Sequence, residues 1–377
     1  MSDDTRDWRQ SAGGLADELA AAGVLSPDWR SAFAEVPRHV FVPRFVADGR
    51  VVDRADPARR AEWFRRVYSD ETLVVQERQV PGTTLMWSTN SSTRPSLMAR
   101  MLGLLDVRDG QRVAEIGTGT GYNVALLSHR LGDANVASID IDPVLVETAR
   151  ERLAGVGYAP YLTTGDGADG IPARAPHDRL IATCAVSRVP PAWIRQLTAD
   201  GVVLADLRGE VASSLLVARK IDADTIQGRF LTTPGDFMWL RARADNPLRD
   251  GGTFPTIQSR EHRHTTLTTL DPSEFGYPDL RFLLQLRVPD LQPFSTDTDV
   301  VGLWTIAGGW ADITKAPTAG GRHHVTYGGP DLLWQTVEAT TELWHRIGRP
   351  ARNRFGLTAG ADGTHRYWLD TPTQVVV

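Results

Sequence analysis

The sequence contains a single cysteine, Cys184, among its 377 residues. One cysteine can form neither an internal disulfide nor a cluster of thiolates around a metal ion. The histidines do not occur at the spacing of metal ligands either. We therefore predict a protein of a reducing compartment, the cytoplasm, without a metal site.

The chain also lacks an excess of basic residues and any long apolar run. Its 41 Lys and Arg residues stand against 46 Asp and Glu residues, giving a net charge of -5. A protein that holds duplex nucleic acid normally has a basic excess. No apolar run approaches the roughly 18 residues that span a bilayer, and the polar N-terminus does not resemble a signal peptide. We expect neither nucleic acid nor a membrane among its partners.

The composition is that of a folded protein. Hydrophobic residues make up 41% and charged residues 23% of the chain, which excludes disorder, collagen and coiled coil. At roughly 150 residues per domain, the length suggests two domains or one domain with a large appendage.

The N-terminal part is predicted to be mainly helical. Apolar residues recur at helical spacing over 15–25, and a second short helix is predicted over 27–36. The prolines of VPRHVFVPRF, residues 36–45, favour an extended segment over a helix. Residues 48–82 mix charges of both signs, which indicates a solvated insertion with a helix around 59–67.

Strands and helices alternate in the middle of the chain. The predicted strands are short aliphatic or β-branched runs over residues 112–117, 135–140, 178–183 and 201–206. The predicted helices between them cover residues 122–131, 143–155 and 191–198. This alternation implies right-handed βαβ crossovers and a parallel sheet with helices on both faces. Two consecutive strands within 213–231 are expected to close the sheet as an antiparallel pair.

From about Arg243 onward the chain changes character, with several Trp residues, many Thr and Gly residues, and no strand–helix alternation. We interpret residues 244–377 as a separate α+β domain, in which 330–348 is a predicted helix. The same interpretation assigns residues 1–82 to a helical region with an insertion and residues 83–243 to the domain that carries the chemistry.

The most informative window is AEIGTGTGYN, residues 114–123, where a predicted strand runs through three glycines into a helix. Glycines at such a turn let the backbone bend sharply and approach a ligand closely, as in the nucleotide sites of doubly wound sheets. Glu115 precedes the first glycine by two residues. A carboxylate there would repel the pyrophosphate of a dinucleotide but suits the positively charged methionyl part of S-adenosylmethionine.

Two further acidic residues follow later strands. Asp140 ends the second strand, about twenty residues after the glycine turn, where an acceptor can hold both hydroxyls of a ribose, of NAD as well as of S-adenosylmethionine. Asp166 follows the third strand, where a carboxylate can accept from an adenine amino group. Each could alone be a turn or helix cap, but three at the ends of consecutive strands favour a cofactor site. The predicted cofactor-binding residues are Glu115, Gly117, Thr118, Gly119, Gly121, Asp140, Asp166 and Gly167.

Five motifs occur together along the chain, namely VPRHVFVP, EIGTGTGYN, GDG, PHDRLIATCAVSRVP and QLTADG. In this order, over about residues 14–232, the chain resembles the protein-L-isoaspartate O-methyltransferases. The resemblance implies an α/β class I S-adenosylmethionine-dependent methyltransferase fold, a Rossmann-like doubly wound sheet, flanked here by the N-terminal helical extension and the C-terminal α+β domain. It also implies methyl transfer from S-adenosylmethionine to a peptide carboxylate, with S-adenosylhomocysteine as the product.

One segment departs from the family pattern. SSTRP, residues 91–95, stands where the repair enzymes of this family carry TIS-x-P, in which a hydroxyl lies beside the transferred methyl group. Thr93 keeps a hydroxyl at that position, whereas Asn90 replaces the preceding Gln. By this resemblance, Ser92 and Thr93 are the predicted catalytic residues. The predicted substrate-binding residues are Ser91, Ser92, Thr93 and Arg94.

The long insertion and the region after Arg243, which the repair enzymes are expected to lack, resemble a variant branch of the family encoded with actinobacterial peptide-maturation systems. This implies methylation of an Asp side chain in a macrocyclic, ribosomally synthesised peptide, which can be a graspetide, a lanthipeptide or a lasso peptide, with a graspetide favoured. The methyl ester then collapses to an aspartimide or isoaspartate. The C-terminal domain would recognise that peptide. Two alternatives stay open: general isoaspartate repair, and a non-catalytic scaffold subunit, against which the intact acidic residues argue.

Overall fold

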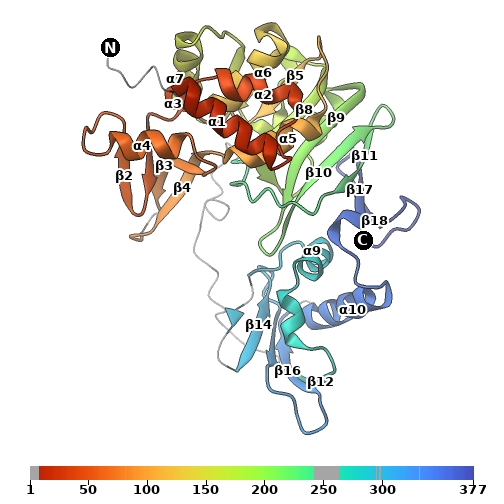
Figure 1. Cartoon of the computed structure of the whole chain (residues 1–377). Coiled ribbons are helices and arrows are strands. Elements are labelled where there is room, and N and C mark those ends of the chain that lie inside the picture. The colour runs from red at the N-terminus through yellow and green to blue at the C-terminus, as the bar shows by residue number, and fades with distance from the viewer. Residues whose placement is uncertain (1–7, 81, 242–262, 294, 297–298, 331) are drawn as a thin grey trace.

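The computed structural model describes residues 8–80, 82–241, 263–293, 295–296, 299–330 and 332–377. The helices within these ranges are α1 (Trp8–Ala21), α2 (Pro27–Glu35), α3 (Arg38–Phe41), α4 (Arg60–Val67), α5 (Pro95–Leu105), α6 (Tyr122–Leu131), α7 (Pro143–Gly155), α8 (Pro191–Arg195), α9 (Pro278–Arg287) and α10 (Leu333–Arg346). The strands within the same ranges form three sheets, of nine, five and four strands (Figure 1).

The largest sheet has the strand order β18-β17-β11-β10-β9-β8-β5-β6-β7. Its strands are β5 (Val113–Ile116), β6 (Val136–Asp140), β7 (Tyr161–Thr164), β8 (His177–Val186), β9 (Leu197–Arg208), β10 (Ser213–Lys220), β11 (Thr225–Phe230), β17 (Phe355–Gly360) and β18 (His365–Leu369). The strands from β9 to β7 pair in parallel, and the other neighbours pair antiparallel. Every residue of β5 and β6 is buried, as expected where helices cover both faces of a parallel sheet.

The predicted alternation of strands and helices is confirmed. The four predicted strands coincide with β5, β6, β8 and β9, and the three predicted helices are present as α6, α7 and α8. The helix predicted over 191–198 is too long, because α8 ends at Arg195 and β9 begins at Leu197. The predicted pair over 213–231 is also antiparallel, as β10 and β11. It does not close the sheet, however, because β11 pairs on its other side with β17.

The N-terminal part combines helices with a small antiparallel sheet. This sheet has the order β2-β1-β3-β4, with β1 (Arg44–Ala47), β2 (Arg50–Asp53), β3 (Leu73–Gln79) and β4 (Met86–Ser92). The predicted helices are present as α1, α2 and α4. The extended segment predicted over 36–45 is wrong in part, because α3 forms one helical turn there. Pro37 directly precedes this turn and Pro43 follows its end, so neither ring disrupts it.

The C-terminal region contains a second antiparallel sheet and two helices. This sheet has the order β12-β16-β15-β14-β13, with β12 (His264–Thr268), β13 (Ser295–Thr296), β14 (Val300–Trp304), β15 (Trp310–Thr314) and β16 (His323–Gly328). The predicted helix over 330–348 is α10.

After α10 the chain returns to the large sheet, where β17 pairs with β11, for example Thr225 with Gly360. Residues 355–369 therefore share a sheet with β5 to β11, and the sequence-based division at residue 243 does not separate the two sheets. No local pattern reveals this return, because the paired residues lie far apart in the chain.

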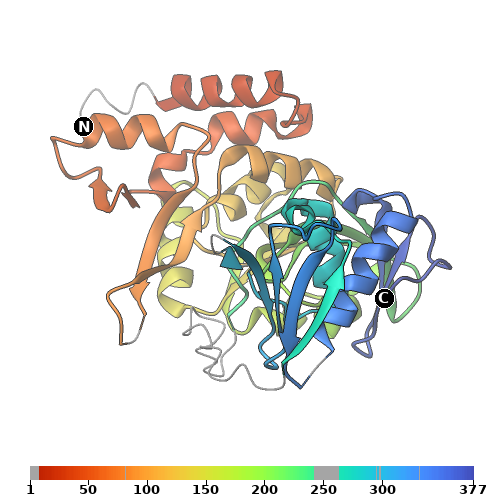
Figure 2. The same ribbon diagram turned by 90° about the horizontal axis from the view of Figure 1, so that it is seen from below.

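Two apolar cores cover the two faces of the large sheet. Residues of α1, α2, α5, α6 and α7 pack against one face, and residues of α8, α9, α10 and the C-terminal sheet form the core on the other. Figures 1 and 2 accordingly show the N-terminal helices at one side of the molecule and the C-terminal sheet at the other.

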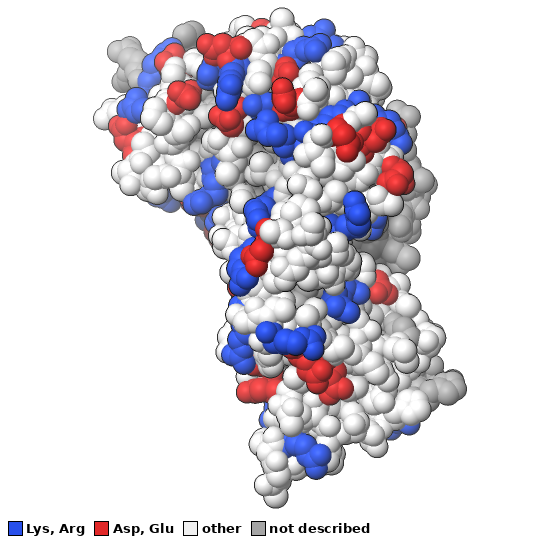
Figure 3. Space-filling view, turned by 90° about the vertical axis from the view of Figure 1, so that its right-hand side faces the viewer, with Lys and Arg blue, Asp and Glu red and all other residues white. Residues whose placement is uncertain are grey.

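The outer surface carries both signs of charge. Basic and acidic side chains are interspersed over the face that Figure 3 shows, so neither sign dominates it. Among the described residues, no helix combines the length and the apolar character needed to cross a membrane.

Candidate active site

A cavity of about 280 Å³ opens at the carboxyl ends of β5 and β6. Its walls come mostly from three parts of the chain: the glycine turn between β5 and α6, the strand β4 as far as Thr93, and the segment 235–241 that follows β11. The predicted site residues that line it are Ser91, Ser92, Thr93, Glu115, Gly117, Thr118, Gly119, Asp140 and Gly167. The fold thus brings the predicted cofactor-binding and substrate-binding groups into one cavity.

The glycine turn needs glycine for both conformation and space. Gly117 and Gly121 have φ values of 101° and 85°, in the left-handed region that favours glycine. A Cβ on Gly117 would lie 2.7 Å from Thr183 Oγ1, and a Cβ on Gly121 would lie 3.0 Å from the Cβ of Ala149 in α7. Gly121 does not line the cavity; instead it lets α6 begin close against α7.

Glu115 is completely buried at the end of β5. Its Oε1 accepts a hydrogen bond from Asn123 Nδ2 at 2.7 Å, and its Oε2 accepts one from Ser138 Oγ at 2.8 Å. Burial is the main cause that raises the pKa of Glu115 to about 7, with the Asp140 carboxylate acting in the same direction and the two hydrogen bonds opposing it. A cationic ligand would favour the ionised form of this carboxyl group.

Asp140 is fixed against the glycine turn. Its Oδ2 accepts from the backbone N–H of Gly119 at 2.9 Å, and its Oδ1 accepts from that of Asp142 at 3.1 Å. Arg241, from the third wall, places its Nη2 atom 3.7 Å from Asp140 Oδ1. The carboxylate still borders the cavity, in the strand-end position predicted for an acceptor of ribose hydroxyls.

Asp166 and Gly167 follow β7, but only Gly167 lines the cavity. The Asp166 carboxylate accepts from the backbone N–H of Ala168 at 2.9 Å and caps the short 3-10 helix η3 (Gly167–Asp169). A Cβ on Gly167 would lie 2.6 Å from Ile116 Cγ2 and 2.8 Å from Leu240 Cδ1, so this wall has no room for a side chain. Contact between Asp166 and adenine stays a prediction.

The predicted acceptor segment lies at the end of β4, against the glycine turn. Ser92 is buried, whereas Ser91 and Thr93 are half-buried. The side chain of Asn90 reaches the turn, because a Cβ on Gly119 would lie 3.0 Å from Asn90 Oδ1. Arg94 is exposed and does not line the cavity. Any contact between Arg94 and the substrate, as predicted from the sequence, would therefore form outside the cavity.

Arg38 supports the acceptor segment through hydrogen bonds to Ser92 and Thr93, a role that the sequence does not indicate. Its guanidinium is fully buried, and Nη2 donates to Ser92 Oγ at 3.3 Å and to Thr93 O at 3.2 Å. Nη1 donates to Val67 O and Ser69 O, each at 3.0 Å. Because Ser92 Oγ accepts from Arg38, the serine hydrogen remains available to a ligand in the cavity. The position of Arg38 among apolar residues in VPRHVFVP is the one sequence signal that could have suggested burial.

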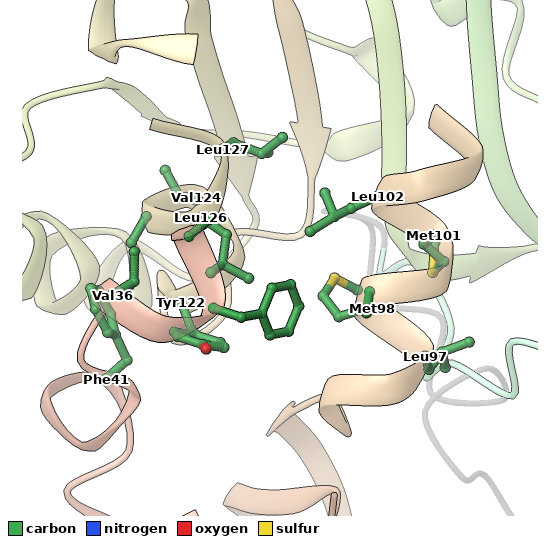
Figure 4. Close-up of a cluster of buried hydrophobic side chains, with 14 of the residues drawn as sticks. Val36, Phe41, Leu97, Met98, Met101, Leu102, Tyr122, Val124, Leu126 and Leu127 are labelled. Carbon is green, nitrogen blue, oxygen red and sulfur yellow. The ribbon is translucent and has the colours of Figure 1, made fainter. Parts of the chain in front are cut away.

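Helix packing aligns the first two walls. The acceptor segment leads directly into α5, and the glycine turn leads directly into α6. Figure 4 shows side chains of the two helices facing one another in the same core, together with Val36 and Phe41 from the N-terminal part. Leu97, Met98, Met101 and Leu102 come from α5, and Tyr122, Val124, Leu126 and Leu127 come from α6. This core fixes where the two helices begin, and therefore how the two walls face each other.

A second buried group that the sequence does not indicate, Asp206 of β9, holds the third wall. Its carboxylate accepts from Ser213 Oγ at 2.6 Å and from the backbone N–H of Phe237 at 3.1 Å. Burial raises the pKa of Asp206. A Cβ on Gly235 would lie 2.6 Å from the carboxyl carbon of Asp206. The segment 235–241 can therefore pass this close to Asp206 only with glycine at position 235.

Two buried polar atoms at the cavity have no hydrogen-bond partner among the described residues. They are Nδ2 of Asn90, a donor, and Oδ1 of Asn123, an acceptor. Buried polar groups are rarely left unpaired, so these two point to a ligand that both accepts and donates. Together with Glu115 and Asp140 they fit S-adenosylmethionine, which carries a carboxylate, an ammonium group and two ribose hydroxyls. A dinucleotide fits less well, because its pyrophosphate would meet Glu115.

The family profile described as protein-L-isoaspartate(D-aspartate) O-methyltransferase matches residues 10–233. This chain belongs to that family. The predicted family and class I fold are thereby confirmed, and the chain is an S-adenosylmethionine-dependent carboxyl O-methyltransferase.

Curated relatives support the same assignment. The protein-L-isoaspartate O-methyltransferase of Ignicoccus hospitalis is 31% identical over 205 residues, which are 54% of this chain and 84% of that protein. The corresponding protein of Halorhodospira halophila is 35% identical over 213 residues, 55% of this chain and 83% of its own length.

A solved structure of a protein-L-isoaspartate O-methyltransferase extends the likeness of fold beyond the matched residues. It aligns over 95% of this chain and 99% of its own, with a TM-score of 0.57 and 21% sequence identity. Because residues 244–377 are more than a third of the chain, most of them must lie within this alignment. The expectation that such enzymes lack a counterpart of the C-terminal region is therefore wrong for that structure.

Proposed function

We propose that this enzyme methylates the side-chain carboxylate of an Asp in a macrocyclic, ribosomally synthesised peptide, with a graspetide favoured, and that the ester collapses to an aspartimide or isoaspartate. The observation that carries the proposal is the acceptor wall, where the segment from Asn90 to Thr93 presents hydroxyl and amide groups beside an acidic cofactor wall.

The acceptor wall suits a carboxylate that needs no general base. A peptide carboxyl group with a pKa of about 4 is already ionised at neutral pH, so the protein has only to align one oxygen with the methyl group. Ser92 and Thr93 supply hydroxyl donors for this. Among the described residues that line the cavity there is no Lys and no His.

The acidic side of the cavity sets the order of binding. Glu115 and Asp140 would repel an acceptor carboxylate as long as they are uncompensated. S-adenosylmethionine, when bound, supplies an electrophilic methyl group on a cationic sulfur. We therefore expect the peptide carboxylate to bind after the cofactor.

The chemistry balances without a further reactant. A carboxylate oxygen forms the new bond to the methyl carbon, the bond from methyl to sulfur breaks, and its electron pair stays on sulfur. The backbone nitrogen of the next residue then attacks the ester carbonyl, and methoxide leaves with the amide proton as methanol. The five-membered imide that remains is about 18 Da lighter than the starting peptide, the mass of one water.

General isoaspartate repair is the second candidate function, because the curated relatives are named for isoaspartate methylation. The C-terminal region does not decide between the two, since a solved isoaspartate methyltransferase aligns with most of it. The altered acceptor segment favours the constrained peptide. A preorganised ring has less conformational entropy to lose on binding than a linear peptide has. A non-catalytic scaffold is disfavoured, because the cavity keeps its carboxylates and unpaired polar groups.

Mass spectrometry of three synthetic peptides tests the proposal. The first contains one Asp in a ring closed by side-chain ester or amide bonds, the second is its linear form, and the third is an unrelated linear peptide with one isoaspartyl residue. We expect methyl ester and then imide on the cyclic peptide, and little product on its linear form. Preferential methylation of the isoaspartyl peptide would instead assign the enzyme to repair, and no product on any peptide would support the scaffold.

A further inference from the structure

We propose that the tip of the β3–β4 hairpin, defined as Leu85, Met86 and Trp87, binds an apolar side chain of the peptide substrate. This inference rests on the proposed function, because its occupant is the peptide that carries the acceptor carboxylate. It adds a docking surface outside the cavity and a distance between that surface and the acceptor residue.

The tip exposes three consecutive large apolar side chains. Leu85 is 66%, Met86 is 55% and Trp87 is 46% exposed. The other strongly exposed large apolar side chains among the described residues have no sequence neighbour of the same kind. Figure 1 shows the hairpin projecting from the body of the molecule. A group of neighbouring exposed apolar side chains marks an interaction site more often than an isolated exposed residue does.

The tip is continuous with the acceptor wall. Trp87 is followed in β4 by the residues from Ser88 to Ser92, all of which line the cavity. At roughly 3.3 Å per residue, Trp87 lies about 16 Å along the strand from Ser92. An extended peptide whose carboxylate reaches Ser92 and Thr93 would therefore bring a residue about five positions away to the tip.

The strand offers a way for a peptide to lie along it. β4 is the last strand of its sheet, and among the described residues it pairs only with β3. The backbone groups on the open side of an edge strand can pair with an added strand, which is a common mode of peptide recognition. The apolar tip at one end and the acceptor groups at the other would then fix the register of the peptide.

Strand β3 is fixed to the cofactor side of the cavity as far as Arg78, which pairs with Trp87 of the tip. Nε2 of Gln76 lies 3.4 Å and Nη2 of Arg78 lies 3.2 Å from Oδ2 of Asp142, the residue that follows β6 by two positions. These contacts hold β3, and through it β4, in a defined position beside the cavity. The distance between tip and acceptor groups is therefore a property of the folded protein.

The experiment combines a variant of the tip with a pair of peptides. The probe is the cyclic or isoaspartyl peptide that the wild type esterifies, extended by about five residues of which the last is Phe. Two such peptides are made, one extended on the N-terminal side and one on the C-terminal side of the residue that is methylated. The matched peptide ends in Ser. The variant is Met86→Ser with Trp87→Ser, and the control variant is Ile221→Ser, which changes a side chain that is 53% exposed and does not line the cavity.

We expect the tip variant to raise the KM for the Phe peptide about tenfold, with kcat and cofactor affinity unchanged, and to leave the KM for the Ser peptide unchanged. The Ile221 variant should behave as the wild type with both. An equal rise for both peptides, or no rise for either, would overturn the docking proposal. So would a wild-type dimer that the tip variant abolishes without a change in KM, because the tip would then bind a second copy of the chain. If the wild type esterifies no peptide at all, the proposed function fails, which is a separate result.

Discussion

The two sides of the active-site cavity are built in different ways. The cofactor side comes mainly from one stretch, from Glu115 to Asp140. The carboxylates of these two residues accept hydrogen bonds from groups within the same stretch. The acceptor side comes from the edge strand β4. Its support, Arg38, and the third wall of the cavity, held by Asp206, come from other parts of the chain.

The difference separates two requirements of a methyltransferase. The cofactor is the same for every turnover, and a rigid, buried set of groups serves it. The acceptor side can change in sequence at the exposed hairpin and at the end of β4 without disturbing the carboxylates across the cavity. Substrate choice can therefore vary while cofactor binding is kept.

Truncation after Arg243 is expected to have the largest effect, because it damages both sides at once. It removes β17 and β18 from the large sheet, so the edge of β11 and core residues such as Phe230 become exposed. We expect loss of the cooperative thermal transition, measured by circular dichroism, or insoluble protein. A soluble truncated chain with wild-type cofactor affinity would show that the two C-terminal strands are dispensable.

Asp140→Ala tests the cofactor side alone. The loss of two hydrogen bonds to ribose hydroxyls, about 1 to 3 kcal/mol in total, should weaken S-adenosylmethionine binding roughly five- to 150-fold in calorimetry. The matched control is Asp178→Ala, which removes a carboxylate that also accepts a backbone hydrogen bond, from Arg112 at 2.8 Å, but at the opposite end of the sheet. Equal affinities of the two variants would contradict the role of Asp140.

Thr93→Ala tests the acceptor side alone. One lost orienting hydrogen bond should lower turnover roughly ten- to a hundredfold, about 1.4 to 2.7 kcal/mol, while cofactor affinity stays the same. Steady-state kinetics and calorimetry on the same preparation measure the two quantities. Ser96→Ala, in the first turn of α5 and outside the cavity lining, should change neither. Full turnover of the Thr93 variant would mean that another hydroxyl group orients the peptide carboxylate.

The ionisation of Glu115 should make both stability and cofactor affinity depend on pH. Its pKa is raised from 4.5 to about 7 in the folded protein, so between these values the unfolded chain releases a proton that the native state keeps. The stability of the wild type relative to Glu115→Gln should therefore fall as pH rises through this window and stay level above it.

Cofactor binding should follow the opposite course. A cationic ligand favours ionised Glu115, so the affinity of the wild type for S-adenosylmethionine should rise as pH increases towards about 7, whereas that of the Gln variant should not. Denaturant unfolding and calorimetry over this pH range measure the two trends. A stability difference that is independent of pH would mean that Glu115 titrates alike in both states.

The predictability of the site follows the same division. The carboxylates of Glu115 and Asp140 could be assigned from the sequence, because Glu115 directly precedes the glycine turn and Asp140 ends the next predicted strand, about twenty residues later. Arg38 and Asp206 could not, because a buried charged residue looks like any surface charge until its partners are known. The same holds for β2 and β3, which lie within residues 48–82, the segment whose mixed charges indicate a solvated insertion.

The sequence by itself determined the alternation of strands and helices, the glycine turn and the chemistry of the cofactor side, because side-chain periodicity and backbone sterics act over a few residues. Only the tertiary structure decided that β17 returns to β11, that Arg38 supports Ser92 and that Asp206 carries the third wall of the cavity. These features depend on pairing and burial between segments distant in the chain. Such contacts form only when the two cores pack against the sheet, and no local pattern records them.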